Sequence, residues 1–174
     1  DWIADNVLVR DEKPAIYLYE QEADYGKSSF TNKGFVALLE LEDLGKHVVS
    51  CEDTTPINKK DRYELLSHTK ANFNMINCMY IESEKYLSRM MTEISDTPPD
   101  VSFTVPDGTK ERLWRITDEE KINFIINALK PHTFYIADGQ NRYETSLAYR
   151  NECRKNNPEH TGKEPYNYIM TLLT

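Results

Sequence analysis

The sequence lacks several features, and each absence excludes a class of protein. No apolar run approaches the ~18 residues that a transmembrane helix needs, and no signal peptide or lipidation motif is visible. The cysteines are Cys51, Cys78 and Cys153, an odd number without the spacing of a metal site. We therefore expect a cytoplasmic protein, in a reducing environment, that does not bind a membrane.

The chain is also poor in positive charge. Lysine and arginine total 21 against 29 aspartate and glutamate residues, which gives a net charge of −8. Non-specific nucleic-acid binding depends on lysine and arginine contacts to phosphates, so a nucleic-acid partner is not expected. A local basic pocket for a small anion is still compatible with this balance.

The overall composition fits a globular domain. Hydrophobic residues make up 39% of the 174 positions and charged residues 29%. We expect one domain over residues 1–174. Because the sequence begins at Asp1 without a methionine and ends in an apolar segment from Tyr166 to Thr174, we expect an internal fragment of a longer protein. The sequence does not decide between a monomer and an oligomer.

Alternation and helical spacing predict an α/β (α+β) domain with a mixed sheet. The expected strands are 15–19, 34–41, 75–81, a hairpin at 101–105 and 109–116, and 133–137. The expected helices are 60–73, 84–94, 117–129 and one from residue 141 onward. The first helix would be amphipathic, with Leu65, Leu66, Thr69 and Phe73 on the face expected to pack against the rest of the domain. Thr117 would cap the third helix, with Glu120 completing a capping box.

The segment 133–145 carries the most specific local signal. Residues 133–137 are β-branched, aromatic and apolar, Asp138-Gly139 is a turn signal, and a helical pattern follows. Bare amides at a helix start, with the guanidinium of Arg142 beside them, favour an anion and above all a phosphate. Asp138 could also hold a metal or accept a proton. The alternative is an ordinary turn in which Asp138 caps the helix and Arg142 pairs with Glu144.

A second candidate region is the loop from Ser50 to Thr55. Its adjacent carboxylates, Glu52 and Asp53, and its hydroxyls could bind Mg²⁺ or act as a general base. The alternative is an acidic loop in which Thr54 or Thr55 makes a local turn hydrogen bond.

Three stretches in order along the chain resemble one known family. Tyr135-Ile-Ala-Asp-Gly-Gln-Asn-Arg-Tyr-Glu-Thr145 is similar to the signature of the family known as domain of unknown function 1015, which typically reads Ile-Ala-Asp-Gly-His-His-Arg-Tyr-Glu-Thr-Ala. Cys51-Glu-Asp-Thr54 followed by Lys60-Asp-Arg62 resembles its His-Glu-x-Thr and Asp-Arg pair. Leu65 to Asn72 resembles its Leu-Leu-x-x-Thr-x-Ala-Asn stretch.

That family is similar to the ParB/sulfiredoxin superfamily, in which a Gly-x-x-Arg turn at a helix start binds nucleotide phosphates. The resemblance implies a ParB/sulfiredoxin-like mixed sheet with flanking helices. It also implies a nucleotide-dependent phosphotransferase, a small-molecule kinase or NTPase that uses ATP, ADP or CTP with Mg²⁺ and a small hydroxyl-bearing substrate. The phosphate-binding residues would be Gly139, Gln140, Asn141, Arg142, Thr54 and Arg62. Glu52 and Asp138 would be catalytic, and Asp53 and Asp138 would hold the metal.

The sequence departs from the family pattern at three positions. Gln140 and Asn141 replace the paired histidines, and Cys51 replaces the histidine of His-Glu. Glutamine and asparagine can donate hydrogen bonds to phosphate, but neither titrates near neutral pH as histidine does. Two alternatives to an enzyme therefore stay open. The chain is either a non-catalytic ParB-like module that binds a nucleotide or partner, or an interaction fragment in which Arg142 and Glu52 form an internal ion pair.

Overall fold

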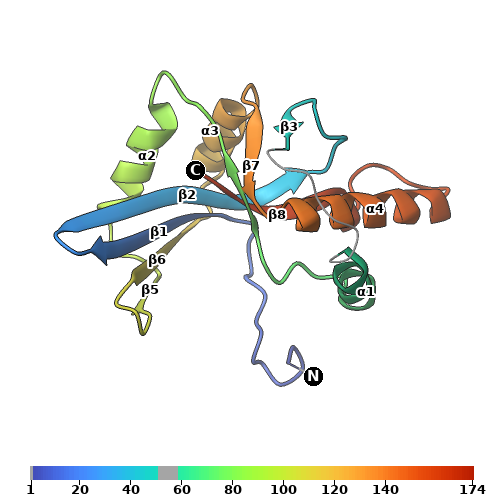
Figure 1. Ribbon diagram of the computed structural model, residues 1–174, viewed down its shortest axis with the longest axis horizontal. Coiled ribbons are helices and arrows are strands. Elements are labelled where there is room, and N and C mark those ends of the chain that lie inside the picture. Colours follow the sequence, from blue (N-terminus) through green and yellow to red (C-terminus); the bar gives the residue numbers. More distant parts are fainter. Residues whose placement is uncertain (1, 51–58) are drawn as a thin grey trace.

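The computed structural model describes residues 2–50 and 59–174 (Figure 1). Eight strands form one mixed sheet: β1 (Ile16–Tyr25), β2 (Ser28–Glu40), β3 (Val48–Val49), β4 (Ile76–Met79), β5 (Val101–Thr104), β6 (Lys110–Ile116), β7 (Phe134–Asp138) and β8 (Tyr168–Leu173). The α-helices of the described residues are α1 (Lys59–Thr69), α2 (Tyr86–Ser95), α3 (Glu119–Leu129) and α4 (Gln140–Asn156). The predicted α/β class with a mixed sheet is confirmed.

The sheet has the strand order β3-β7-β4-β8-β2-β1-β6-β5. Strands β8, β2, β1, β6 and β5 run antiparallel to their neighbours in that series, whereas β3 with β7 and β4 with β8 are parallel pairs. Strand β8, the apolar end of the sequence, therefore lies inside the sheet between β4 and β2.

The first two strands pair antiparallel, and both are longer than the expected strands 15–19 and 34–41. The pairing continues to Tyr25 opposite Ser28, so the turn consists of Gly26 and Lys27 alone. Gly26 has a φ of 67°, which a non-glycine residue adopts only with strain. The extended hairpin projects from the rest of the molecule in Figure 1.

One hydrophobic core joins the sheet to α2 and α3. Strand residues such as Leu18, Phe35 and Ile76 pack there with Leu87 of α2 and Ile125 of α3, all fully buried. These side chains follow the two periods expected of strands and helices, and their burial is the main source of stability.

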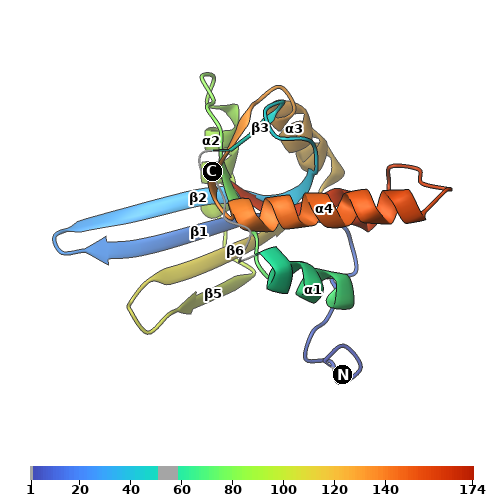
Figure 2. The same cartoon turned by 45° about the vertical axis from the view of Figure 1, so that its right-hand side comes forward.

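Two helix predictions are wrong in detail. Helix α1 ends at Thr69, where Lys70 turns left-handed with a φ of 53°, and it has no buried residue. Its main contact is α4 instead of the core, as Figure 2 also shows. Asp118, not Thr117, caps α3, because its carboxylate accepts a 2.8 Å hydrogen bond from the Lys121 amide. Across the described residues no helix is both long and apolar enough to cross a membrane.

Candidate anion-binding site

The junction between β7 and α4 has the predicted strand, glycine turn and helix. Gly139 stands before the first turn of α4 with a φ of 95°. A Cβ at this position would lie 2.7 Å from Ile76 Cγ2 and 2.8 Å from Arg142 Nη2. The turn therefore requires glycine for two reasons, its left-handed backbone and the side chains packed against it.

Arg142 folds back across this turn onto Asp138. Its Nη2 donates a 2.6 Å hydrogen bond to Asp138 Oδ2. The Asp138 side chain is 76% exposed and that of Arg142 23% exposed, so the ion pair faces water. Such pairs contribute only about 0–1 kcal/mol, and Arg142 can exchange Asp138 for another anion at little cost.

Several buried polar atoms in the first two turns of α4 have no hydrogen-bond partner in the described part of the chain. They are Gln140 Oε1, Asn141 Oδ1, Arg142 Nε and Thr145 Oγ1. Gln140 and Thr145 are only 2% and 4% exposed. Leaving a buried polar group unpaired costs about 1–3 kcal/mol, and such groups are rare in folded proteins. Their concentration within residues 140–145 marks a place where a group outside the described residues could pair with them.

A cleft of about 80 Å³ lies beside these atoms, between α1 and α4. Its polar lining comprises Arg62, Asn72, Asn74, Arg142, Thr145 and Ser146, and its apolar lining comprises Leu65, Leu66, Ala71 and Phe73. No carboxylate is among these lining residues. Arg62 makes no hydrogen bond or ion pair with any residue that the structure describes. The cleft therefore presents two guanidinium groups, of which Arg142 pairs with the exposed Asp138 and Arg62 with no described carboxylate.

Contacts between α1 and α4 fix the position of Arg62 opposite Arg142. Lys59, at the start of α1, forms an ion pair with Glu144, which also accepts a 2.8 Å hydrogen bond from Gln140 Nε2. One helical turn further on, the Tyr63 hydroxyl donates to Glu152, and this hydrogen bond is the main reason that the pKa of Tyr63 rises to about 12. The two helices are thus held together on either side of Arg62.

The structure brings together some of the residues that the sequence singled out. Arg62 and Arg142 line one cleft, and Asp138 lies within hydrogen-bonding distance of Arg142. Among the described residues, Gly139, Gln140 and Asn141 form the helix start beside the cleft without lining it.

Most of the acidic loop from Ser50 to Thr55 lies outside the described residues. Glu52, Asp53 and Thr54 lie outside the described residues, so the catalytic, metal-binding and phosphate-binding roles expected of them stay predictions. Within residues 2–50 and 59–174, no group of three or more histidine, cysteine, aspartate or glutamate side chains is placed to hold a metal.

The sequence pattern did not identify Thr145, Ser146 and Asn72 as site residues. A signal was present, because Asn72 closes the Leu65 to Asn72 stretch and Thr145 closes the Tyr135 to Thr145 stretch. The structure folds these two distant stretches onto opposite walls of one cleft.

Comparison with known proteins supports one assignment. No curated protein and no solved structure matches the chain. The model of the family described as Protein of unknown function (DUF1015) matches residues 1–174. Since this match covers the whole sequence, the chain belongs to the DUF1015 family.

Proposed function

We propose that this chain binds a phosphate-bearing small molecule in the α1–α4 cleft and that its ligand is a nucleotide such as ATP, ADP or CTP. One observation carries the proposal. Arg62, Arg142 and the Thr145 hydroxyl, which has no partner among the described residues, line a cleft to which none of the described lining residues contributes a carboxylate, in a chain whose net charge is −8. Two guanidinium groups lining one cleft of an acidic chain favour an anionic occupant there.

The chemistry of the lining groups suits a phosphate. Each arginine offers a planar fork of donors that matches phosphate oxygens, and the hydroxyls of Thr145 and Ser146 add short-range donors. A hydrogen bond to a charged group contributes about 1.5–3 kcal/mol, more than the roughly 0–1 kcal/mol lost when Arg142 leaves exposed Asp138. The exchange therefore favours the ligand.

The reaction proposed for the loaded domain is phosphoryl transfer to a small hydroxyl-bearing acceptor, or hydrolysis. The similarity of the family to the ParB/sulfiredoxin superfamily supports this step. Glu52 would take the proton from the acceptor hydroxyl, and Asp138 with Asp53 would hold Mg²⁺ against the phosphates. Most of the catalytic effect would come from positioning and charge stabilisation by the cleft.

A non-catalytic nucleotide-binding module is the second candidate, and one observation favours it. Gln140, which stands where the family has a histidine, is buried and donates its amide to Glu144. The described lining of the cleft holds no group that titrates near neutral pH. Binding is therefore better supported than turnover.

Calorimetric titration of the full chain with ADP, ATP and CTP in the presence of Mg²⁺ tests the proposal. Arg142→Ala should weaken binding about 10- to 100-fold, and Arg142→Lys should recover part of the loss. Arg115→Ala is the matched control, because Arg115 pairs with Asp11 and does not line the cleft. Absence of heat with all three nucleotides would overturn the proposal.

A turnover assay separates the two candidates once binding is established. Phosphate release or transfer that is lost in Glu52→Gln would select the enzyme, and binding without turnover over hours would select the module.

A further inference from the structure

A second cavity, of about 400 Å³, opens from the α1–α4 cleft. Both are lined by Leu66, Asn72 and Ser146, which places them side by side along α1 and α4. Pockets for small organic ligands typically measure about 300–1,000 Å³. The cleft can hold a phosphate group but not a nucleotide, whereas the second cavity has the size of a ligand site.

The wall of the second cavity is mostly aromatic and apolar. Its side chains include Leu38 of β2, Tyr149 of α4, Tyr166 of the short 3-10 helix Pro165–Asn167, and Tyr168, the first residue of β8. Leu38 is 65% exposed although it lies in a central strand. Flat aromatic faces of this kind bind nucleobases by stacking, with little dependence on which base is present.

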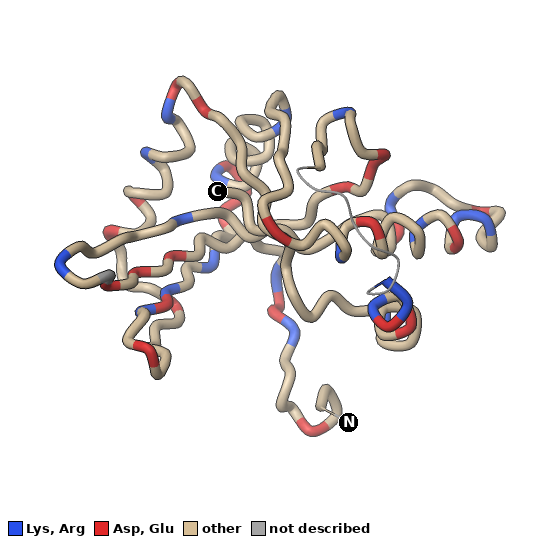
Figure 3. The backbone as a smooth tube through the Cα atoms, viewed as in Figure 1, with Lys and Arg blue, Asp and Glu red and all other residues tan. Residues whose placement is uncertain are grey.

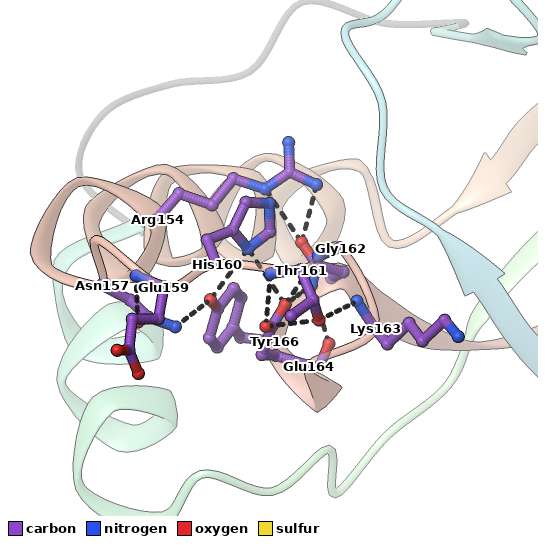
Figure 4. Close-up of polar contacts among 10 residues, drawn as sticks. Arg154, Asn157, Glu159, His160, Thr161, Gly162, Lys163, Glu164 and Tyr166 are labelled. Atoms are coloured by element: carbon purple, nitrogen blue, oxygen red, sulfur yellow. Dashed lines mark hydrogen bonds and ion pairs between the residues drawn. The ribbon is translucent and has the colours of Figure 1, made fainter.

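Contacts within the protein hold two rings of this wall, and Figure 4 shows those around Tyr166. The Tyr166 hydroxyl accepts a 3.2 Å hydrogen bond from Asn157 Nδ2, and its ring stacks on His160 with centroids 6.0 Å apart. Tyr149 meets the Tyr63 ring edge-on at 6.2 Å. Preformed walls reduce the ordering cost of binding.

A network of hydrogen bonds holds the loop that carries Tyr166. The Glu164 carboxylate accepts hydrogen bonds from Thr161 N at 2.7 Å and Gly162 N at 3.0 Å, and lies 3.0 Å from His160 Nδ1. Asn167 is fully buried and its Oδ1 accepts from Arg154 Nη2 at 2.6 Å. The close-up shows Arg154, His160 and Glu164 on different sides of the Tyr166 ring.

Charge in the second cavity continues the pattern of the cleft. Arg10 and Lys70 line it, and no carboxylate is among its lining residues. The two cavities together are therefore lined by four cationic side chains, Arg62, Arg142, Arg10 and Lys70, and by three tyrosine rings.

We propose that the second cavity is the nucleoside subsite of the ligand whose phosphates occupy the cleft. The base stacks against the tyrosine wall, with Tyr149 as its principal contact, while the phosphates reach Arg62 and Arg142. This inference rests on the proposed function, since it assigns the rest of the same ligand.

Calorimetry on the full chain with pyrophosphate, ADP and CDP as probes tests the assignment. Both nucleoside diphosphates should bind at least about tenfold more tightly than pyrophosphate, because base stacking adds affinity that pyrophosphate lacks. Tyr149→Ala should remove that advantage and leave pyrophosphate affinity unchanged, and Tyr149→Phe should keep it. Tyr86→Ala is the control, since Tyr86 is an exposed residue of α2 outside both cavities.

The outcomes separate this inference from the proposed function. Equal affinity for pyrophosphate and both nucleoside diphosphates, or an equal loss for all three probes in Tyr149→Ala, would overturn the nucleoside subsite alone. No binding of any probe would overturn both proposals.

Discussion

Two regions of the molecule differ in how completely their charged groups are paired. One is the hairpin arm, formed by β1, β2 and β6, and the other is the α1–α4 face, the surface of these two helices around the cleft. On the arm, Glu20 is 6% exposed and pairs with Arg112 and, at 3.1 Å, with Lys33. Glu22 accepts from Arg112 at 2.9 Å and from Lys110 at 2.8 Å. Figure 3 shows both signs of charge interspersed along these strands.

The α1–α4 face is paired less completely. Lys59 pairs with Glu144 and Arg142 with Asp138, but Arg62 forms no ion pair with a described carboxylate, and Thr145 Oγ1 is buried without a partner among the described residues. Charges that neutralise one another hold strands in register, whereas buried donors and acceptors left unpaired reduce stability and persist where a ligand completes them. The difference indicates that the charged residues of the arm stabilise the sheet, whereas those of the α1–α4 face are candidates for ligand binding.

The largest change in stability is expected when alanine replaces a glycine with a left-handed backbone. Gly139 lies at the α1–α4 face and Gly108 near the arm. Gly139→Ala should lower the free energy of unfolding by about 2–4 kcal/mol, because backbone strain adds to the clash with Ile76 and Arg142. Gly108→Ala, in the β5–β6 turn of the sheet edge next to the arm, should cost only the strain of about 1–2 kcal/mol, since a Cβ there meets nothing within 4 Å. Urea denaturation measures both.

Equal losses in the two variants would contradict this expectation, because they would mean that Ile76 and Arg142 move aside freely. Gly139→Ala should also weaken nucleotide binding through Arg142, and Gly108→Ala should not.

A second pair of variants tests the paired and unpaired groups directly. Glu20→Gln should lower stability by about 1–2 kcal/mol, since Arg112 and Lys33 lose their shared carboxylate. Thr145→Val keeps the shape of the side chain and removes the unpartnered hydroxyl, so the ligand-free chain should be unchanged or stabilised by up to about 1 kcal/mol. Thermal or urea unfolding without ligand measures each change.

Ligand affinity should move the other way. Thr145→Val should weaken nucleotide binding, whereas Glu20→Gln should leave it unchanged because Glu20 lies outside the cleft. A clear loss of ligand-free stability in Thr145→Val would show that the hydroxyl has a hydrogen-bond partner within the protein and is therefore not available to a ligand.

Sequence patterns predicted local structure well and spatial neighbours less well. The Asp138-Gly139 turn and the helix after it followed from residue types alone, because both depend on backbone conformation. The burial of helix 60–73 was predicted wrongly. Leu65 is 52% exposed and lines the cleft, since an apolar stripe does not reveal whether it faces a core or a pocket.

The pairings that define the site could not be read from the chain. Arg62 and Arg142 are 80 positions apart, and only the packing of α1 on α4 brings them to one cleft. The aromatic wall has the same origin, because Tyr149 and Tyr166 meet through the loop that reverses α4 into β8. The strand-turn-helix pattern with Arg142 predicted anion binding and the resemblance strengthened that prediction, but spatial arrangement was needed to connect Asn72 and Thr145 with it.

The smallest expected effect is a pH-dependent change in melting temperature at Glu164, a hydrogen-bonded carboxylate in the loop that follows α4. Hydrogen bonds from the Thr161 amide and hydroxyl lower the pKa of Glu164 from its ordinary value of 4.5 to about 2. Because the folded state holds the ionised form, Glu164 contributes stability that is fully present above pH 4.5 and is lost as the pH falls toward 2. Glu164→Gln should therefore melt at a lower temperature than the parent chain at pH 6–7, and the difference should shrink between pH 4.5 and 2.

Glu159→Gln, an exposed neighbour in the same loop, is the control and should leave the melting profile unchanged. Melting temperatures followed by circular dichroism across this range would decide the point, and a difference independent of pH would mean that Glu164 acts through its shape alone.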